Sequence, residues 1–200
     1  MLVNLNDVLD PARKGKYAVG LFNTVNLELA RGVMEAAEEL DSPVIIGTAE
    51  VLLPYGPLED LANLLIPMAE RSPVPVVVHL DHGLKEETCR QALNLGFSSI
   101  MYDCSTMEYE ANIGRVKKMA ETAHACGASI EAELGHVGDN GGEDPSLFYT
   151  DSAQARDFIE RTGADALAIA VGTAHGAYRL PPRLDFNRIA EIAETIPTPL

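Results

Sequence analysis

Short apolar runs alternate with amphipathic segments along the whole chain. Apolar runs rich in β-branched residues are typical of buried parallel strands, and apolar residues three and four positions apart are typical of helices. The pattern predicts strands over residues 17–23, 43–48, 74–82, 99–103, 129–135 and 166–173, and the start of another at 197–200. It predicts helices over residues 26–40, 57–71, 86–95, 109–126, 151–161 and 185–194, with a polar, glycine-rich loop over 136–149.

Six strand–helix units in series predict a parallel α/β fold. A (β/α)8 TIM barrel and a doubly wound sheet both fit this alternation. No GxGxxG motif follows the first strand, which weakens the dinucleotide-binding, doubly wound alternative. A barrel needs eight units. We therefore expect a single barrel domain over residues 1–200 that is incomplete at its C-terminal end, with about six units present and the last two missing.

Composition narrows the class of protein. The chain is 46% apolar and 22% charged, which is ordinary for a soluble globular protein. Its net charge of −15 argues against a nucleic-acid surface, because such surfaces cluster Lys and Arg. Three cysteines without a CxxC motif favour a reduced compartment. With no signal-like segment and no run of membrane-spanning length, we expect a cytoplasmic protein with neither nucleic-acid nor membrane partners.

Residues 74–83 read VPVVVHLDHG, an apolar strand that ends in an acid, an imidazole and a glycine. In barrels of this kind the chemistry lies at the carboxyl ends of the strands. A carboxylate beside a histidine at such an end favours proton transfer beside a metal. Asp81 and His82 are therefore the first candidate site residues.

Other predicted strand ends carry similar side chains. These are Asn23, Asp103 with Ser105, Glu131 and Glu133 with Gly135, and His175 within Gly172-Thr173-Ala174-His175-Gly176. One histidine at a strand end is more often hydrogen-bonded structure than a ligand, but two at matching ends with acids between them favour a metal site. His79 is interpreted as a core or supporting residue. No lysine stands at a predicted strand end, which disfavours Schiff-base chemistry.

The chain resembles the class II, zinc-dependent ketose-bisphosphate aldolases, most closely the tagatose-bisphosphate aldolase type. The resemblance extends over the whole chain, and HLDHG, EAELG and VGTAHG together are specific to that family. It is carried by YAVGLFNTVNLE, SPVIIG, HLDHG, SSIMYDCS, EAELGHVG and FYTDSAQARDFIERTGADALAIAVGTAHGAY.

The resemblance implies roles for most of the candidate residues. His82 and His175 match zinc ligands, and Asp103 and Glu133 match carboxylates that orient the zinc or hold a second cation, divalent or monovalent. Asp81 matches the acid that exchanges a proton with the aldehyde oxygen. The remaining matches are Glu143, the loop acid that takes the donor's carbon-bound proton, and the substrate contacts Asn23, Thr48, Ser105 and Gly176.

The resemblance implies a lyase of carbohydrate metabolism. It also implies a homodimer or homotetramer whose partner is a small sugar phosphate. Such a lyase cleaves a ketose 1,6-bisphosphate to glycerone phosphate and glyceraldehyde 3-phosphate through a zinc-stabilised enediolate. The family places a third zinc histidine on the seventh strand, and the sequence ends at Leu200, before that point. A non-catalytic remnant or interaction protein of the same fold, and an aldolase for another sugar phosphate, are the alternatives.

Overall fold

The computed structural model describes residues 1–137, 149–176, 178 and 181–200. The chain forms two compact units. Unit 1 comprises Met1–Asp103 and Met119–Glu131, and unit 2 comprises Cys104–Lys118 and Ala132–Leu200. The prediction of a single domain over residues 1–200 stays a prediction.

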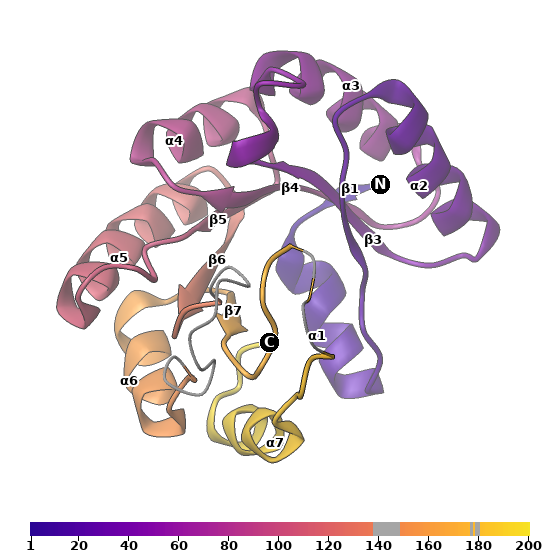
Figure 1. Cartoon of the computed structure of the whole chain (residues 1–200). Coiled ribbons are helices and arrows are strands. Elements are labelled where there is room, and N and C mark those ends of the chain that lie inside the picture. Colours follow the sequence, from indigo (N-terminus) through magenta and orange to yellow (C-terminus); the bar gives the residue numbers. More distant parts are fainter. Residues whose placement is uncertain (138–148, 177, 179–180) are drawn as a thin grey trace. The chain divides into compact units, whose positions relative to one another are not determined.

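Strands and helices alternate along the chain (Figure 1). The strands are β1 Leu2–Val3, β2 Leu21–Asn23, β3 Val44–Ala49, β4 Val76–Gly83, β5 Ser99–Tyr102, β6 Ser129–Leu134 and β7 Ala166–Ile169. The α-helices are α1 Leu5–Gly15, α2 Leu27–Glu39, α3 Leu58–Arg71, α4 Glu86–Leu95, α5 Tyr109–Ala125, α6 Ser152–Thr162 and α7 Phe186–Thr195, and Glu50–Leu52 forms a short 3-10 helix, η1.

The strand order confirms the predicted fold class. Strands β1 to β6 pair in parallel with their neighbours, and the strand order is β2-β3-β4-β5-β6-β7, with β1 beside β4. A doubly wound sheet reverses its strand order at a switch point, whereas a (β/α)8 barrel does not. The unbroken order therefore identifies the α/β barrel class, and the carboxyl ends of successive strands are the place to look for chemistry.

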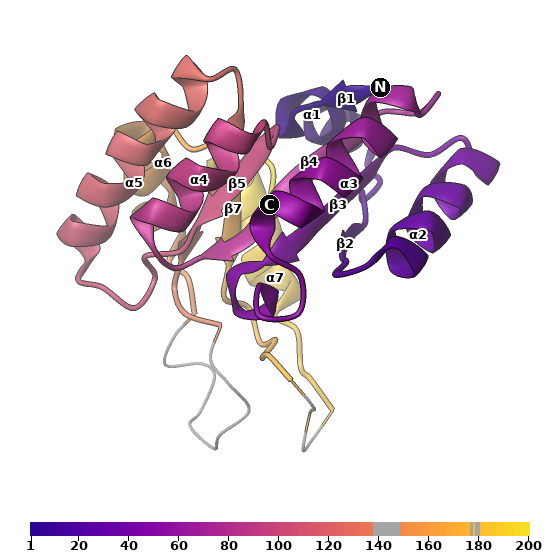
Figure 2. The ribbon, with the colours of Figure 1, turned by 90° about the horizontal axis from the view of Figure 1, so that it is seen from above.

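Strand β4 is the centre of unit 1. Its residues Val76 to Leu80 are buried, and Figures 1 and 2 show α3 and α4 along β4 and β5. Strand β3 approaches β4 so closely at Gly47 that a Cβ there would lie 2.0 Å from the carbonyl oxygen of His79. Only glycine fits this position, which explains Gly47 within the apolar sequence VIIGTA of β3.

The sequence patterns missed the first two elements, β1 and α1. Asn4 caps α1 by accepting hydrogen bonds from the backbone N–H groups of Asn6 and Asp7, and the Asp7 carboxylate accepts one from the backbone N–H of Asn4. Such a capping box, followed by a buried face of Leu5 and Val8, was the signal that could have revealed this helix.

The other predicted elements differ from the structure mainly at their ends. The first predicted strand, 17–23, is only Leu21–Asn23, and the last complete one, 166–173, is Ala166–Ile169. Residues 197–200 form no strand in the described chain, although the N–H of Leu167 donates to the carbonyl of Pro199 at 3.0 Å. Strand ends are set by pairing partners, which local patterns do not specify.

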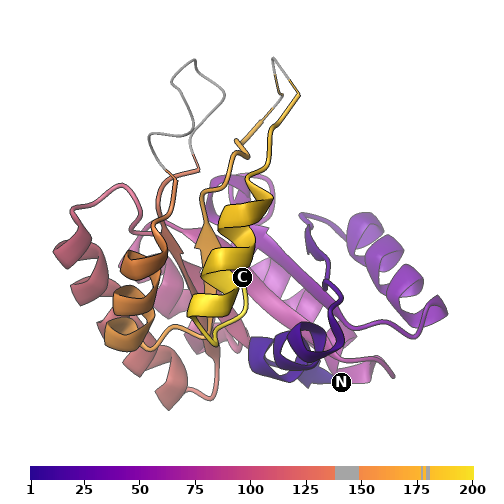
Figure 3. The same ribbon diagram turned by 90° about the horizontal axis from the view of Figure 1, so that it is seen from below.

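Polar contacts join the helices of unit 2 at their exposed edges. The yellow helix α7 lies beside the orange helix α6 in Figure 3, and the Ser152 hydroxyl donates to Glu191 at 2.5 Å between them. Arg161 of α6 donates to Glu110 of α5 at 2.6 Å. Desolvation and a hydrogen bond to Asp157 raise the pKa of Tyr109 to about 12, so this phenol stays protonated.

Among the described residues, no helix is long and apolar enough to cross a membrane.

Candidate active site

The end of β4 changes from buried apolar residues to half-buried polar ones. Asp81 and His82 keep 16% and 23% of their side-chain surface exposed, whereas Leu80 is fully buried. His82 has a φ of 42°, in the left-handed region that costs a non-glycine residue about 1 kcal/mol. At Gly83 a Cβ would lie 2.5 Å from the Cys89 sulfur, so glycine is required there. HLDHG is thus a tight, irregular strand ending, at which the pairing of β4 with β5 shifts register between Leu80 and Gly83.

Glu50 holds the turn that follows. Its carboxylate accepts hydrogen bonds from the backbone N–H groups of Leu84 at 2.7 Å and Lys85 at 3.1 Å. Lys85 is the N-cap residue of α4 and supplies no side-chain cap, so Glu50 caps the helix from η1. The sequence did not reveal this role, because the two segments lie 34 residues apart.

Asp81 is oriented by Asn23. The Asn23 side-chain N–H donates to Asp81 Oδ2 at 2.7 Å, which joins the ends of β2 and β4. The other oxygen, Oδ1, lies 4.0 Å from His82 Nε2, beyond hydrogen-bond distance. The amide thus fixes the orientation of the Asp81 carboxylate through Oδ2. The predicted role of Asp81 in proton exchange stays a prediction.

His82 is oriented by Asp103. Its Nδ1 lies 2.9 Å from Asp103 Oδ2, and because an ionised carboxylate only accepts, Nδ1–H donates. A metal-binding histidine commonly donates one ring N–H to a carboxylate, which fixes the ring and directs the other nitrogen to the metal. In this arrangement Nε2 is the ring nitrogen of His82 that fits a metal ion. The predicted role of Asp103 as a metal ligand stays a prediction, and in the structure it orients the histidine.

Unit 2 holds a second group of predicted residues. Glu133 of β6 has only 2% of its side chain exposed, and its Oε1 accepts from the Val137 N–H at 3.1 Å. His136 Nδ1 lies 3.9 Å from the same oxygen and 3.3 Å from the Ser105 hydroxyl. Asn112 donates to the Glu133 carbonyl at 3.1 Å. A buried carboxylate is thereby held in place, and Ser105 contacts His136.

The remaining candidates are in different surroundings. Thr48 is fully buried, and its hydroxyl has no hydrogen-bond partner within the described residues. His175 and Gly176 of unit 2 are exposed, and Gly176 has a φ of 78°. Glu143 lies outside the described residues. The roles predicted for these four residues stay predictions.

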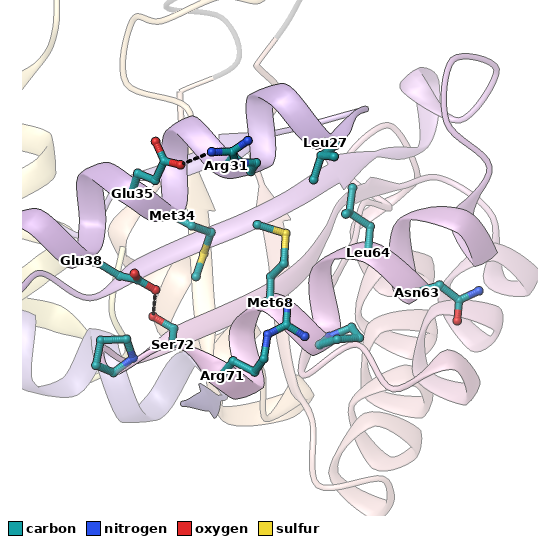
Figure 4. A pocket seen from close by; sticks show the side chains of 12 residues that line it. Leu27, Arg31, Met34, Glu35, Glu38, Asn63, Leu64, Met68, Arg71 and Ser72 are labelled. Atoms are coloured by element: carbon teal, nitrogen blue, oxygen red, sulfur yellow. Dashed lines mark hydrogen bonds and ion pairs between the residues drawn. The ribbon is translucent and has the colours of Figure 1, made fainter.

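A groove of about 590 Å³ lies in unit 1 between helices α2 and α3 (Figure 4). The Arg31–Glu35 ion pair at 2.8 Å lies on its α2 side, and Ser72 donates to Glu38 at 2.8 Å. None of the predicted site residues lines it. The chemistry is expected at the strand ends rather than in this groove.

Comparison with known proteins identifies the family. The family described as Fructose-bisphosphate aldolase class-II matches residues 3–200. The chain belongs to the class II fructose-bisphosphate aldolase family. It is 43% identical to the fructose-bisphosphate aldolase of Thermus caldophilus, over 100% of this chain and 67% of that protein. It is 40% identical to the fructose-bisphosphate aldolase of Geobacillus stearothermophilus, over 100% of this chain and 71% of that protein.

A solved structure agrees with this membership of the class II fructose-bisphosphate aldolases. The crystal structure of the YdjI aldolase from Escherichia coli K12 matches with a TM-score of 0.89 and 36% identity, over 100% of this chain and 71% of that chain. The resemblance read from the sequence is therefore confirmed at the level of the family. The tagatose type within it stays a prediction.

Proposed function

We propose that the chain carries the proton-transferring acid and part of the metal shell of an aldolase that acts on a ketose 1,6-bisphosphate. The products would be glycerone phosphate and glyceraldehyde 3-phosphate. The observation that carries this proposal is the pair of dyads at the end of β4, Asn23 with Asp81 and Asp103 with His82. Two adjacent side chains, each held by its own partner, suit a division between proton transfer and metal binding.

Asp81 would move the proton on the hydroxyl of the bond-breaking carbon. In cleavage, its Oδ1 takes that proton as the carbon–carbon bond breaks, and in synthesis it returns the proton to the aldehyde oxygen. Asn23 keeps the carboxylate in one orientation through the 2.7 Å hydrogen bond to Oδ2. Glu143 is proposed as the base for the donor's carbon-bound proton.

The proposed zinc ligands are His82 and His175, with Asp103 and Glu133 orienting the ion or holding a second cation. Asp103 supports this through its hydrogen bond to His82 Nδ1, which leaves Nε2 as the ligand atom. When bound, zinc would act as a Lewis acid that stabilises the enediolate formed by deprotonation of the donor. The class II family is metal-dependent, and the proposal assigns zinc as its ion here.

Substrate contacts are proposed at Asn23, Thr48, Ser105 and Gly176. The backbone N–H of Gly176 can bind a phosphate oxygen without a basic side chain, which suits a chain with a net charge of −15. We further propose a homodimer or homotetramer. The fructose and tagatose epimers differ only at one carbon, and both are proposed substrates.

The test is an aldol cleavage assay with fructose 1,6-bisphosphate and tagatose 1,6-bisphosphate in parallel. We expect cleavage of at least one epimer, its loss after chelation and its return with zinc. Asp81→Asn should keep its zinc, measured by elemental analysis, and lose most turnover. Activity that survives complete removal of the metal would exclude the proposed mechanism, and absence of cleavage with full zinc loading would favour a non-catalytic member of the family.

A further inference from the structure

A histidine of β4 that the proposed mechanism does not use lies in the interior of unit 1. His79 is fully buried, two residues before Asp81 and on the same face of the strand. Its Nδ1 lies 2.8 Å from the hydroxyl of Ser99 on β5. Its Nε2 has no hydrogen-bond partner among the described residues. A buried polar atom without a partner is costly, so this nitrogen calls for an explanation.

The group facing that nitrogen is Glu131. Its Oε2 lies 3.5 Å from His79 Nε2, just too long for a full hydrogen bond. The Glu131 side chain is 22% exposed although His79 is not exposed at all. One end of this carboxylate thus faces the buried imidazole, and the side chain also reaches solvent.

The carboxylate decides which ring nitrogen carries the proton. A neutral imidazole has one N–H and one acceptor nitrogen. If Nε2 were the acceptor, its lone pair would face a carboxylate oxygen, which is repulsive. The favoured form has Nε2–H directed at Glu131, with the Ser99 hydroxyl donating to Nδ1. Burial, opposed by the charge of Asp81, lowers the pKa of His79 to about 4, which keeps the ring neutral near pH 7.

We propose that Glu131 is an additional substrate-binding carboxylate, accepting a hydrogen bond from a hydroxyl of the sugar phosphate, and that His79 is its positioning residue. Movement of the carboxylate by a few tenths of an ångström would complete the Nε2–H hydrogen bond, and the solvent-exposed part of the Glu131 side chain is what would meet the substrate. Glu131 faces His79, which lies about 7 Å from Asp81 along β4. One sugar chain is long enough to span this distance. This inference rests on the proposed aldolase function.

The first test needs no activity. Nitrogen-15 NMR of the histidine rings in the whole chain should show His79 as the Nε2–H tautomer from pH 6 to 8. Ser99→Ala removes the donor to Nδ1 and should shift the ring signals of His79 without unfolding the protein. A His79 ring that carries its proton on Nδ1 would overturn the proposal, whether or not the protein is an aldolase.

The second test is kinetic and uses zinc-loaded protein. Glu131→Gln should raise KM about tenfold or more, as expected for loss of a charged hydrogen bond, with unchanged zinc content. His79→Leu should do the same, while His79→Gln, whose amide can donate in place of Nε2–H, should restore most of the loss. His124→Leu, which changes an exposed histidine of α5, is the matched control and should leave KM unchanged.

The outcomes separate the two proposals. If the parent chain cleaves the substrate and Glu131→Gln matches its KM, or if that variant loses zinc instead, the assignment of Glu131 is wrong and the aldolase proposal stands. Equal losses in His79→Leu and His79→Gln would exclude the positioning role. If the zinc-loaded parent cleaves neither epimer, the aldolase proposal fails and takes the substrate role of Glu131 with it.

Discussion

His82 Nδ1 and Asp103 Oδ2 lie 2.9 Å apart, so a carboxylate at the end of β5 fixes the imidazole at the end of β4. The residues are 21 positions apart in the sequence and meet because their strands are paired neighbours. A histidine held in this way loses little freedom when it binds a metal, which strengthens binding.

Asp103→Asn should weaken zinc binding about 10- to 100-fold, because the amide can no longer orient and polarise the His82 ring as the carboxylate does. Competition titration with a fluorescent chelator would measure the affinity. Asp10→Asn, which changes an exposed acid of α1, serves as the control. Equal affinities for parent and Asp103→Asn would show that the pair does not support a metal site.

Asn23→Ala should lower kcat by about tenfold or more with little change in zinc content, because Asp81 loses the donor to Oδ2. Steady-state cleavage kinetics with metal analysis of the same samples would test this. Asn63→Ala is the control: it changes an exposed asparagine on α3, beside the groove of Figure 4, and should leave kcat unchanged. An Asn23→Ala enzyme with parental kcat would show that the amide is not needed for catalysis.

Glu50→Ala should destabilise the protein by about 1 to 2 kcal/mol, since two backbone N–H groups at the start of α4 lose their acceptor. The free energy of unfolding in urea would give the difference. Glu39→Ala, at the exposed end of α2, is expected to change it by less than about 0.5 kcal/mol. Similar values for the two variants would contradict the capping role.

Stability should fall with acid through His79. Burial lowers the pKa of this ring from 6.5 to about 4. The charge of Asp81 opposes this lowering and that of His82 adds to it, while Glu131 faces Nε2. Below pH 6.5 the His79 ring is protonated in the unfolded chain but stays neutral in the folded chain. The contribution of this group to stability is therefore complete above pH 6.5 and is lost as the pH falls toward 4. The loss from this group is about 3 kcal/mol.

Urea unfolding between pH 7 and 4.5 measures this effect as the difference between parent and His79→Gln, because the variant lacks the ring whose pKa is lowered. The parent should show the steeper loss. Parallel curves for the two proteins would mean that His79 does not contribute.

The sequence by itself determined the order of strands and helices and the class of chemistry. Period-two and period-3.6 patterns are local properties of the chain, so strands β3 to β6 and their helices could be predicted to within a few residues. A polar Asp-His pair that interrupts an apolar run is also a local signal. The capping box of α1 was equally local and was overlooked.

Only the tertiary structure decided which partner each side chain has. Asn23 and Asp81 are 58 residues apart, and no pattern in either segment indicates that one donates to the other. The cap that Glu50 places on α4 and the carboxylate that Glu131 turns toward His79 likewise arise from strand pairing and packing. Residue types determine what chemistry a strand end can perform, whereas distances of a few ångströms, set by the sheet, determine which groups act together.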